Sequence, residues 1–229
     1  MPIMELSPRG ELLDQRVKDL CLEVIGKLTL PNYLYRRYVA PVHFNGRGLH
    51  LHLGCGKSHL PGFVNIDANP LHKTELWLDV RNGLPFPDGS VDSIYSTHML
   101  EHFYADELDR LVRECVRALK PGGGMRIVVP NLASAVVAYA EGNAAWFSSE
   151  FPRLYSSLGG KFANFIFCGG QHKTAFDFEY FRELLTTAGL SEVVELAEGL
   201  SRLYGTHVPA YQPEDDRRLP HSLYLEAFK

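Results

Sequence analysis

The sequence predicts an α/β fold built on a doubly wound, mostly parallel β-sheet. Short apolar runs alternate along the chain with longer segments whose apolar residues recur at helical spacing, which is typical of βαβ units. The first apolar run, 51–53, ends in the tight turn Gly54-Cys55-Gly56, and the next, 63–66, ends at Asp67. Ligands of open parallel sheets bind at the edge where the strands end. The turn and the acid therefore predict a ligand site.

The remaining strands and the first helix follow from their own patterns. Residues 11–30 have the apolar spacing of an amphipathic helix, which is the main part of an N-terminal helical segment over 1–43 that we expect to pack on the sheet. The next three strands are predicted over 74–80, 93–96 and 125–129.

Two later helices and two further strands complete the predicted fold. Residues 106–120 predict a crossover helix, whose apolar face is formed by Leu108, Leu111, Val112, Cys115, Val116 and Leu119. Asp177 can cap a second helix that Gly189 ends. Strands over 191–195 and 222–228 then supply an antiparallel ending. The sum is about seven strands, a Rossmann-like sheet with an antiparallel C-terminal strand.

Length and charge narrow the class of protein. With 229 residues and a formal charge of −4, the chain predicts a single domain without the general basic field that nucleic-acid binding needs. No apolar stretch reaches the ~20 residues of a membrane span, and the first residues lack the apolar core of a signal peptide. We therefore expect a cytoplasmic protein. Its oligomeric state is not predicted.

The spacing of the residues after the glycine turn decides between two classes of nucleoside cofactor that could bind there. A dinucleotide fingerprint has a third small residue and an acid about 20 positions on. Here His59 occupies the third position, Asp67 comes much sooner, and Pro61-Gly62 leaves little room for a phosphate-binding helix. A nicotinamide-dependent oxidoreductase is therefore the weaker alternative.

Further motifs follow the turn in order. Residues 84–92 read LPFPDGSVD, residues 97–102 read THMLEH, and residues 120–124 read KPGGG before an apolar run. In order and spacing this resembles the class I S-adenosylmethionine (SAM)-dependent methyltransferases, in particular a branch of small bacterial predicted methyltransferases. The resemblance implies SAM as the cofactor. It also implies a set of cofactor-binding residues: Gly54, Cys55 and Gly56 for the methionine end, Asp67 for the ribose, Ala68, Asp79 and Val80 for the adenine, and Ser96.

Histidines supply the candidate catalytic groups. An acceptor hydroxyl or ammonium must lose a proton during methyl transfer, and a neutral imidazole is a suitable base. His98 follows the fourth predicted strand, and Glu101 and His102 share a face with it if a helix begins there. His172 precedes the late helix and could fold back over the same edge. His98 is the first candidate, and a structural role for Glu101 and His102 stays open.

A metal is an alternative to a base at these residues. The set His98, Glu101, His102 and His172 is similar to the E-x-x-E-H motif plus distant histidine that binds a divalent ion in small-RNA 2′-O-methyltransferases, with His98 replacing a glutamate. Imidazole-rich ligands would suit zinc or iron better than magnesium. We predict a metal-free site, and the metal remains the alternative.

An aromatic insertion lies within 131–175. Tyr139, Trp146, Phe147, Phe151 and Tyr155 fall in 132–161, directly after the fifth strand. An insertion there would cover the acceptor pocket as a lid; alternatively the aromatics fill a satellite core. The sequence thus predicts a SAM-dependent methyltransferase acting on a small molecule, a sugar or natural-product hydroxyl above all. A non-catalytic SAM-binding regulatory module is the alternative.

Overall fold

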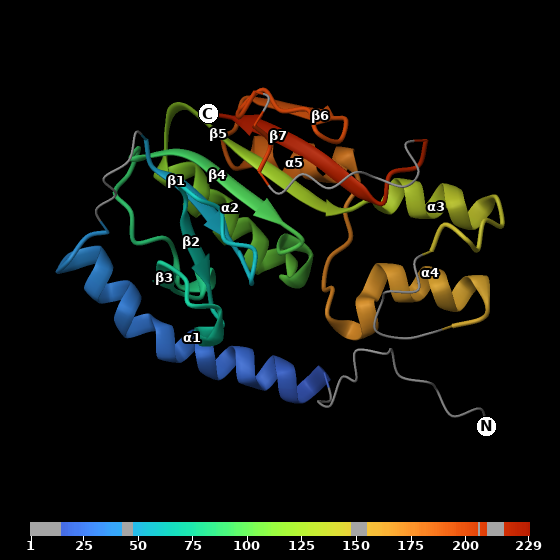
Figure 1. Cartoon of the computed structure of the whole chain (residues 1–229), viewed down its shortest axis with the longest axis horizontal. Coiled ribbons are helices and arrows are strands. Elements are labelled where there is room, and N and C mark those ends of the chain that lie inside the picture. The colour runs from blue at the N-terminus through green and yellow to red at the C-terminus, as the bar shows by residue number, and fades with distance from the viewer. Residues whose placement is uncertain (1–14, 43–47, 148–154, 206, 210–217) are drawn as a thin grey trace.

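A seven-stranded sheet organises the chain (Figure 1). The structure is a computed structural model that describes residues 15–42, 48–147, 155–205, 207–209 and 218–229. The strand order is β3-β2-β1-β4-β5-β7-β6. The first five run parallel: β1 (His50–Leu53), β2 (Val64–Asp67), β3 (Leu76–Trp77), β4 (Val91–Thr97) and β5 (Leu119–Pro130). β7 (Ser222–Phe228) pairs antiparallel with β5 and with β6 (Glu192–Leu196). The predicted Rossmann-like sheet is confirmed.

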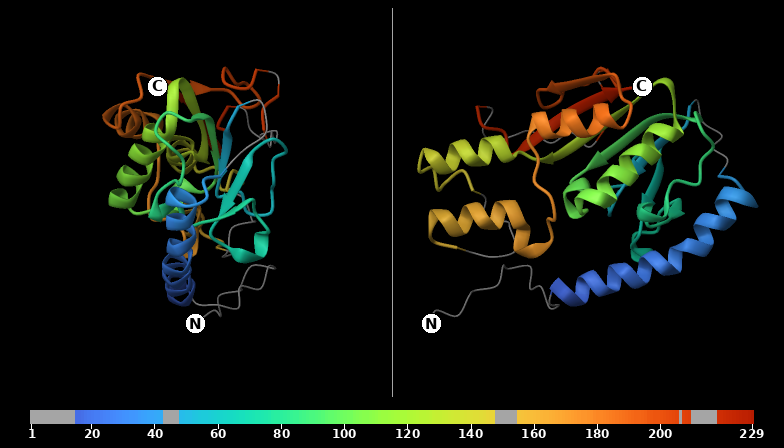
Figure 2. Two further views of the ribbon diagram at one scale, coloured as in Figure 1. Left: turned by 90° about the vertical axis from the view of Figure 1, so that its left-hand side faces the viewer. Right: turned by 180° about the vertical axis from the view of Figure 1, so that it is seen from behind.

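Helices α2 (Ala105–Ala118) and α5 (Phe178–Thr187) lie on one face of the sheet (Figure 2). The predicted apolar stripe of α2 is buried through Leu108, Leu111, Val112 and Cys115. In α5 the Asp177 side chain accepts a hydrogen bond from Tyr180 N at 2.9 Å, so the predicted N-cap is confirmed.

Strand β5 begins earlier than predicted, directly after α2, and includes the glycine run. A Cβ on Gly123 would lie 2.9 Å from the Asp92 carbonyl oxygen, and one on Gly124 would lie 2.9 Å from that of Ala227. The absence of side chains lets neighbouring backbones approach closely. Strand β3 is shorter than the predicted 74–80 because Asp79 caps the 3₁₀ turn η2 (Val80–Asn82), accepting from Arg81 N at 2.9 Å.

A row of polar side chains crosses the opposite face of the sheet. The strand register pairs Asn65 with His52, His52 with Tyr95, Tyr95 with Arg126, and Arg126 with Glu226. All five are buried. Arg126 Nη1 donates to Glu226 Oε1 at 3.0 Å, and Glu226 Oε2 also accepts from backbone nitrogens over 202–203. These bonds hold an irregular segment over this face.

Helix α1 (Gln15–Tyr38) corrects the N-terminal prediction. It is one helix that continues through Pro31, where the sequence predicts an end at residue 30. Its apolar side chains were expected to pack on the sheet, yet Leu20 and Leu28 are each 59% exposed. Only Gly26 and Thr29 are buried within it. The predicted apolar stripe is therefore not a core face in this structure.

Polar contacts attach α1 to the segment around β3 instead. Asn32 Nδ2 donates to the Trp77 carbonyl at 2.7 Å, and Thr29 Oγ1 accepts from Asp79 N at 3.1 Å. Arg81 Nη2 donates to the Leu22 carbonyl at 3.0 Å. The helix thereby lies along the edge of the sheet beside β3 (Figure 1).

The insertion contains α3 (Leu132–Ala140) and α4 (Leu158–Phe167), which is followed by the 3₁₀ turn η4 (Cys168–Gly170). The aromatic side chains of the insertion differ in burial. Trp146 and Phe147 are buried in what we call the satellite cluster, whereas Tyr139 is exposed and Phe151 lies outside the described residues. The satellite cluster comprises Ala135, Ala138, Trp146, Phe147, Phe165 and Leu219. The lid role stays a prediction. Among the described helices, none combines the length and apolarity needed to cross a membrane.

Candidate functional site

The glycine turn after β1 is built from two residues with positive φ. Gly54 has φ +65° and Gly56 has φ +54°, a region that L-residues with a Cβ disfavour. Crowding distinguishes the two positions. A Cβ on Gly54 would lie 2.4 Å from Met99 Cγ, whereas one on Gly56 would have nothing within 4 Å. Met99 therefore packs directly on the turn, and only Gly54 is sterically enclosed.

This difference predicts unequal effects of alanine. Both Gly54→Ala and Gly56→Ala should carry the left-handed strain of roughly 1–2 kcal/mol. Gly54→Ala should cost about 1–3 kcal/mol more, because Met99 must move. Urea unfolding of both variants measures the difference in the free energy of unfolding. Equal destabilisation would contradict the packing of Met99 on Gly54, and adding Met99→Ala to Gly54→Ala should recover part of the loss.

The carboxylate of Asp67 connects β2 to the glycine turn. Its Oδ2 accepts from Gly56 N at 2.8 Å, and its Oδ1 accepts from Asn69 N at 2.7 Å. His72 Nδ1 lies 3.1 Å from Oδ1. These contacts fix the orientation of the carboxylate at the end of its strand. A fixed acceptor at this edge is suited to a ribose diol.

One pocket brings together most of the predicted cofactor residues. Its cavity of about 210 Å³ opens to solvent and is smaller than the ~300–1,000 Å³ typical of ligand pockets. The predicted members are Gly54, Asp67, Ala68, Asp79 and Val80, and His102 joins them from the predicted catalytic set. The other lining residues are Leu22, Ile66, Leu78, Arg81, Met99, Phe103 and Glu107.

Asp79 is held by Arg81 at the far end of this pocket. Arg81 Nη2 donates to Asp79 Oδ2 at 2.6 Å and Arg81 Nε donates to Asp79 Oδ1 at 3.1 Å. Gly26 of α1 packs so closely that a Cβ there would lie 2.7 Å from Asp79 Oδ2. Helix α1 therefore forms part of the pocket wall, through Leu22 and through its contact with Asp79.

Two other predicted cofactor residues are placed differently. Cys55 lies in the turn but is buried, donating its backbone N–H to the Ile66 carbonyl at 3.1 Å. Burial raises the pKa of its thiol to about 12, so it stays protonated near neutral pH. Ser96 is buried in β4, and its Oγ has no hydrogen-bond partner among the described residues. Neither of them is among the residues that line the pocket, and Gly56 is not among these residues either.

His98 follows β4 in an unusual backbone conformation. Its φ is +47°, which non-glycine residues seldom adopt and which is concentrated at functional sites. The backbone N–H of His98 donates to the Val128 carbonyl at 2.8 Å, which fixes this turn. The side chain is 51% exposed, and its Nδ1 lies 3.4 Å from Glu101 Oε1. An accessible imidazole thus stands beside a buried carboxylate.

Glu101 and His102 lie on the 3₁₀ turn η3 (Leu100–His102), and His172 approaches from the segment after η4. His172 Nε2 is 4.0 Å from Glu101 Oε1, and the rings of His102 and His172 lie 5.1 Å apart. The structure thus brings together all four predicted catalytic residues, His98 included. His102 is exposed, so replacing it should disturb the fold little.

Burial and neighbouring charge shift the pKa of Glu101 in opposite directions. Burial alone would raise the pKa of its carboxyl, but the neighbouring His98 and His102 hold that pKa below its ordinary value. Glu101 is therefore a carboxylate at neutral pH. Burial lowers the pKa of His172, so this imidazole is neutral.

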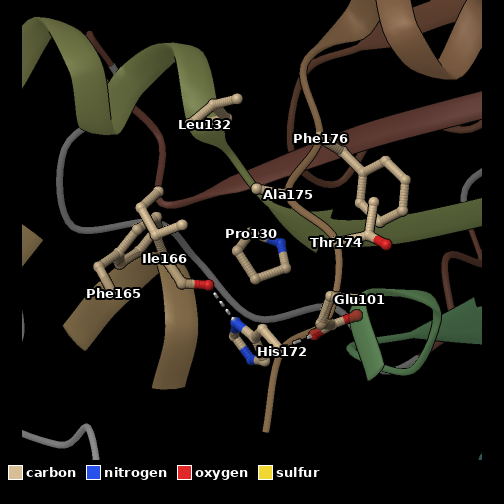
Figure 3. Close-up of a pocket in the computed structure, with 9 residues that line it drawn as sticks. All are labelled: Glu101, Pro130, Leu132, Phe165, Ile166, His172, Thr174, Ala175 and Phe176. Carbon is tan, nitrogen blue, oxygen red and sulfur yellow. Dashed lines mark hydrogen bonds and ion pairs between the residues drawn. The ribbon is translucent and has the colours of Figure 1, made fainter. Parts of the chain in front are cut away.

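A second recess adjoins this group beneath the insertion (Figure 3). His172 and Glu101 face each other at one end, and α4 contributes Phe165 and Ile166 to the wall. The remaining lining residues are Pro130, Leu132, Thr174, Ala175 and Phe176. The recess therefore combines an apolar wall with a polar end.

Comparisons with known proteins agree with this geometry. Residues 66–127 match a family model described as a methyltransferase domain. A probable S-adenosylmethionine-dependent methyltransferase of Mycolicibacterium smegmatis is 30% identical over 137 residues, which are 48% of this chain and 52% of that protein. The alignment thus spans about half the length of this curated relative.

Solved structures share the fold. A SAM-dependent methyltransferase from Archaeoglobus fulgidus has a TM-score of 0.50 at 18% identity, covering 93% of this chain and 99% of that one. A possible histamine N-methyltransferase from Thermotoga maritima has a TM-score of 0.50 at 14% identity, covering 93% and 96%. These solved structures show that the chain has the fold of SAM-dependent methyltransferases.

The segment that matches the methyltransferase model begins after the glycine turn and contains Asp67, Asp79, His98 and Glu101. Sequence analysis missed seven residues that line the pocket, among them Leu22 and Met99. Leu22 gave no signal because its helix was expected to pack elsewhere. Met99 lies between two predicted residues, and its position after β4 could have indicated a contact with the turn.

Proposed function

We propose that this chain transfers the methyl group of SAM to a hydroxyl of a small molecule, a sugar or a natural product. The observation that supports this most is the pocket where Gly54, Asp67 and Asp79 meet at the carboxyl ends of β1, β2 and β3. The described link from Gly54 to β2 contains no helix. A pyrophosphate would therefore lack the helix N-terminus on which dinucleotide sites depend.

Each pocket residue has a role in this proposal. The turn at Gly54, with Cys55 and Gly56 behind it, would let the methionine end of SAM approach the backbone. Asp67 would bind the ribose hydroxyls, and Ala68 would leave space for the adenine. Asp79 and Val80 would meet the adenine edge, with Arg81 holding the Asp79 carboxylate in place. Ser96 is buried in β4, so it would support the cofactor site without lining the pocket.

The acceptor would occupy the neighbouring side, where His98 and the second recess lie. Methyl transfer from a sulfonium is an in-line displacement, so alignment of donor and acceptor supplies much of the acceleration. A hydroxyl must also lose a proton, and His98 is the accessible imidazole at the end of β4. Glu101 would orient His98, and His172 would border the acceptor. The recess itself holds only about 10 Å³, so the acceptor would lie beside His98 rather than within the recess.

The assignment of Asp67 predicts a loss of cofactor affinity. Asp67→Asn should weaken SAM binding by at least about tenfold, because a charge-assisted hydrogen bond is worth roughly 1.5–3 kcal/mol. Calorimetric titration with SAM, S-adenosylhomocysteine (SAH) and NADH measures the affinity of the variant and of the wild type for each cofactor. Glu75→Gln is the matched control, since Glu75 accepts a backbone N–H bond from Asn65 at 3.0 Å outside the pocket lining.

The same titrations discriminate between the functions. Unchanged SAM affinity in Asp67→Asn would remove the ribose assignment, and tight NADH binding without SAM binding would refute the cofactor. A catalytic role needs a further measurement, because a regulatory module would also bind SAM. SAH formation on a panel of hydroxylated sugars and natural products would show turnover. Cofactor binding without turnover on any acceptor would favour the non-catalytic module.

A further inference from the structure

Glu101, His102 and His172 form a cluster that could hold a metal ion. Each offers one ligand atom, and these atoms lie within 4.8 Å of one another. Two of the ligands come from η3 and the third from the segment after η4, so the fold brings the set together from distant parts of the chain. Figure 3 shows His172 and Glu101 pointing toward each other.

The buried carboxylate of Glu101 is only partly paired, because its histidine neighbours stabilise the charge from the Oε1 side. Its side chain is 2% exposed, and Oε2 has no hydrogen-bond partner in the part of the chain that the structure describes. The nearest imidazole nitrogens, on His98 and His172, lie 3.4 Å and 4.0 Å from Oε1, beyond the ~2.7–3.2 Å of a good N–H···O bond. Burying a charge without such partners is costly. A cation would supply what is missing.

Backbone carbonyls orient both cluster histidines. His172 Nδ1 lies 3.1 Å from the Ile166 carbonyl oxygen, and His102 Nδ1 lies 3.2 Å from that of Gln171. A carbonyl only accepts, so each Nδ1 carries the hydrogen and each Nε2 keeps its lone pair. Metal-binding histidines typically donate their other N–H to such a group. In His172 this lone pair faces the Glu101 carboxylate, so two acceptors oppose each other.

The geometry points to a divalent transition-metal site formed by Glu101, His102 and His172. Two imidazoles and one carboxylate suit Zn²⁺ or a similar ion, whereas Mg²⁺ and Ca²⁺ prefer oxygen ligands. Ligand atoms on one zinc ion lie about 3.4 Å apart, so the cluster must contract slightly. The side chain of His102 is exposed and can make this movement. Three protein ligands leave a coordination position free, as in catalytic zinc sites.

Such an ion would act on the acceptor rather than on SAM. It would lie between the cofactor pocket, which His102 lines, and the second recess, which Glu101 and His172 line. A hydroxyl that reaches it would lose its proton more readily, and His98 beside Glu101 would receive that proton. This role rests on the proposed methyl transfer, whereas binding of the ion does not.

Metal content and metal affinity test the site directly. Protein purified without an affinity tag is analysed for zinc, iron and manganese, then treated with a chelator and titrated calorimetrically with Zn²⁺ and with Mg²⁺. We expect saturable, stoichiometric Zn²⁺ binding and much weaker Mg²⁺ binding. Absence of saturable Zn²⁺ binding, or equal affinity for Mg²⁺, would overturn the proposal.

Variants assign the ligands. His102→Gln and His172→Gln should each weaken Zn²⁺ binding by more than the ~10- to 100-fold typical of a lost outer-shell partner. His59→Gln, which removes an exposed imidazole elsewhere, is the matched control and should bind as the wild type does. His102 is exposed, so its variant should fold even if the buried His172 variant does not. Equal losses in His59→Gln and His102→Gln would refute the cluster as the site.

Titration of the same samples with SAH separates this proposal from the proposed function. SAH binding without Zn²⁺ binding would refute the metal site and leave the proposed methyltransferase function standing. Zn²⁺ binding without SAH binding would refute the proposed function and leave the metal site standing.

Discussion

Replacing His98 with asparagine is expected to lower turnover by about 10²- to 10⁴-fold, the range typical of a lost general base. SAM affinity should stay near that of the wild type, because His98 is not among the residues that line the cofactor pocket. Asparagine is the informative substitution. It tolerates the left-handed conformation that His98 adopts at φ +47°, so the variant removes the imidazole without adding backbone strain.

Turnover with a saturating acceptor and calorimetric SAM binding measure the two quantities. His59→Gln serves as the control for the loss of an exposed imidazole. Wild-type turnover in His98→Asn would assign proton removal to another group. A parallel loss of SAM affinity would instead indicate that the side chain of His98 supports the cofactor turn.

Local patterns in the sequence predicted which residues meet around the glycine turn. The glycine turn and Asp67 are close in the chain, and the bond from Gly56 N to Asp67 Oδ2 closes a short loop. The buried face of α2 was also predictable, because helical periodicity within one segment determines it. Such features need no knowledge of distant partners.

Long-range pairings were not predictable in this way. Arg126 stands between the apolar residues Met125 and Ile127, and its partner Glu226 is opposite it only because β5 and β7 pair in one register. Helix α1 has an apolar stripe, yet hydrogen bonds to residues around β3 decide its position. The residues next to Arg126 or within α1 do not indicate which distant residues these will contact. Periodicity therefore misassigned the stripe of α1 to the core.

His172 was predicted to reach the site, and the structure shows how it does. The backbone N–H groups of Lys173 and Thr174 donate to the Glu101 carbonyl at 2.8 and 3.2 Å. These bonds tie the segment after η4 to η3. The insertion supplies the other support, because the Ile166 carbonyl of α4 lies 3.1 Å from His172 Nδ1. The position of His172 thus depends on how α4 is packed.

Replacing Phe165 with alanine should therefore affect both stability and the acceptor side. Phe165 is 2% exposed and packs on Trp146 with ring centroids 5.0 Å apart. Removing a buried aromatic ring costs about 3–5 kcal/mol, which should loosen α4 and release the Ile166 carbonyl from His172. Phe167→Ala is a matched control on the same helix: its ring is 60% exposed, and it should change the free energy of unfolding by less than about 0.5 kcal/mol.

Urea unfolding, limited proteolysis over 132–170 and acceptor turnover distinguish the two views of the insertion. If the satellite cluster fixes α4 against the site, Phe165→Ala should increase cleavage in this segment and lower turnover while SAM affinity is retained. A lid that moves as one unit predicts, in addition, that SAM and acceptor together protect the wild-type segment from cleavage. Full turnover in a destabilised Phe165→Ala would show that the insertion does not position His172, and the acceptor site would then have to be sought on the other side of His98.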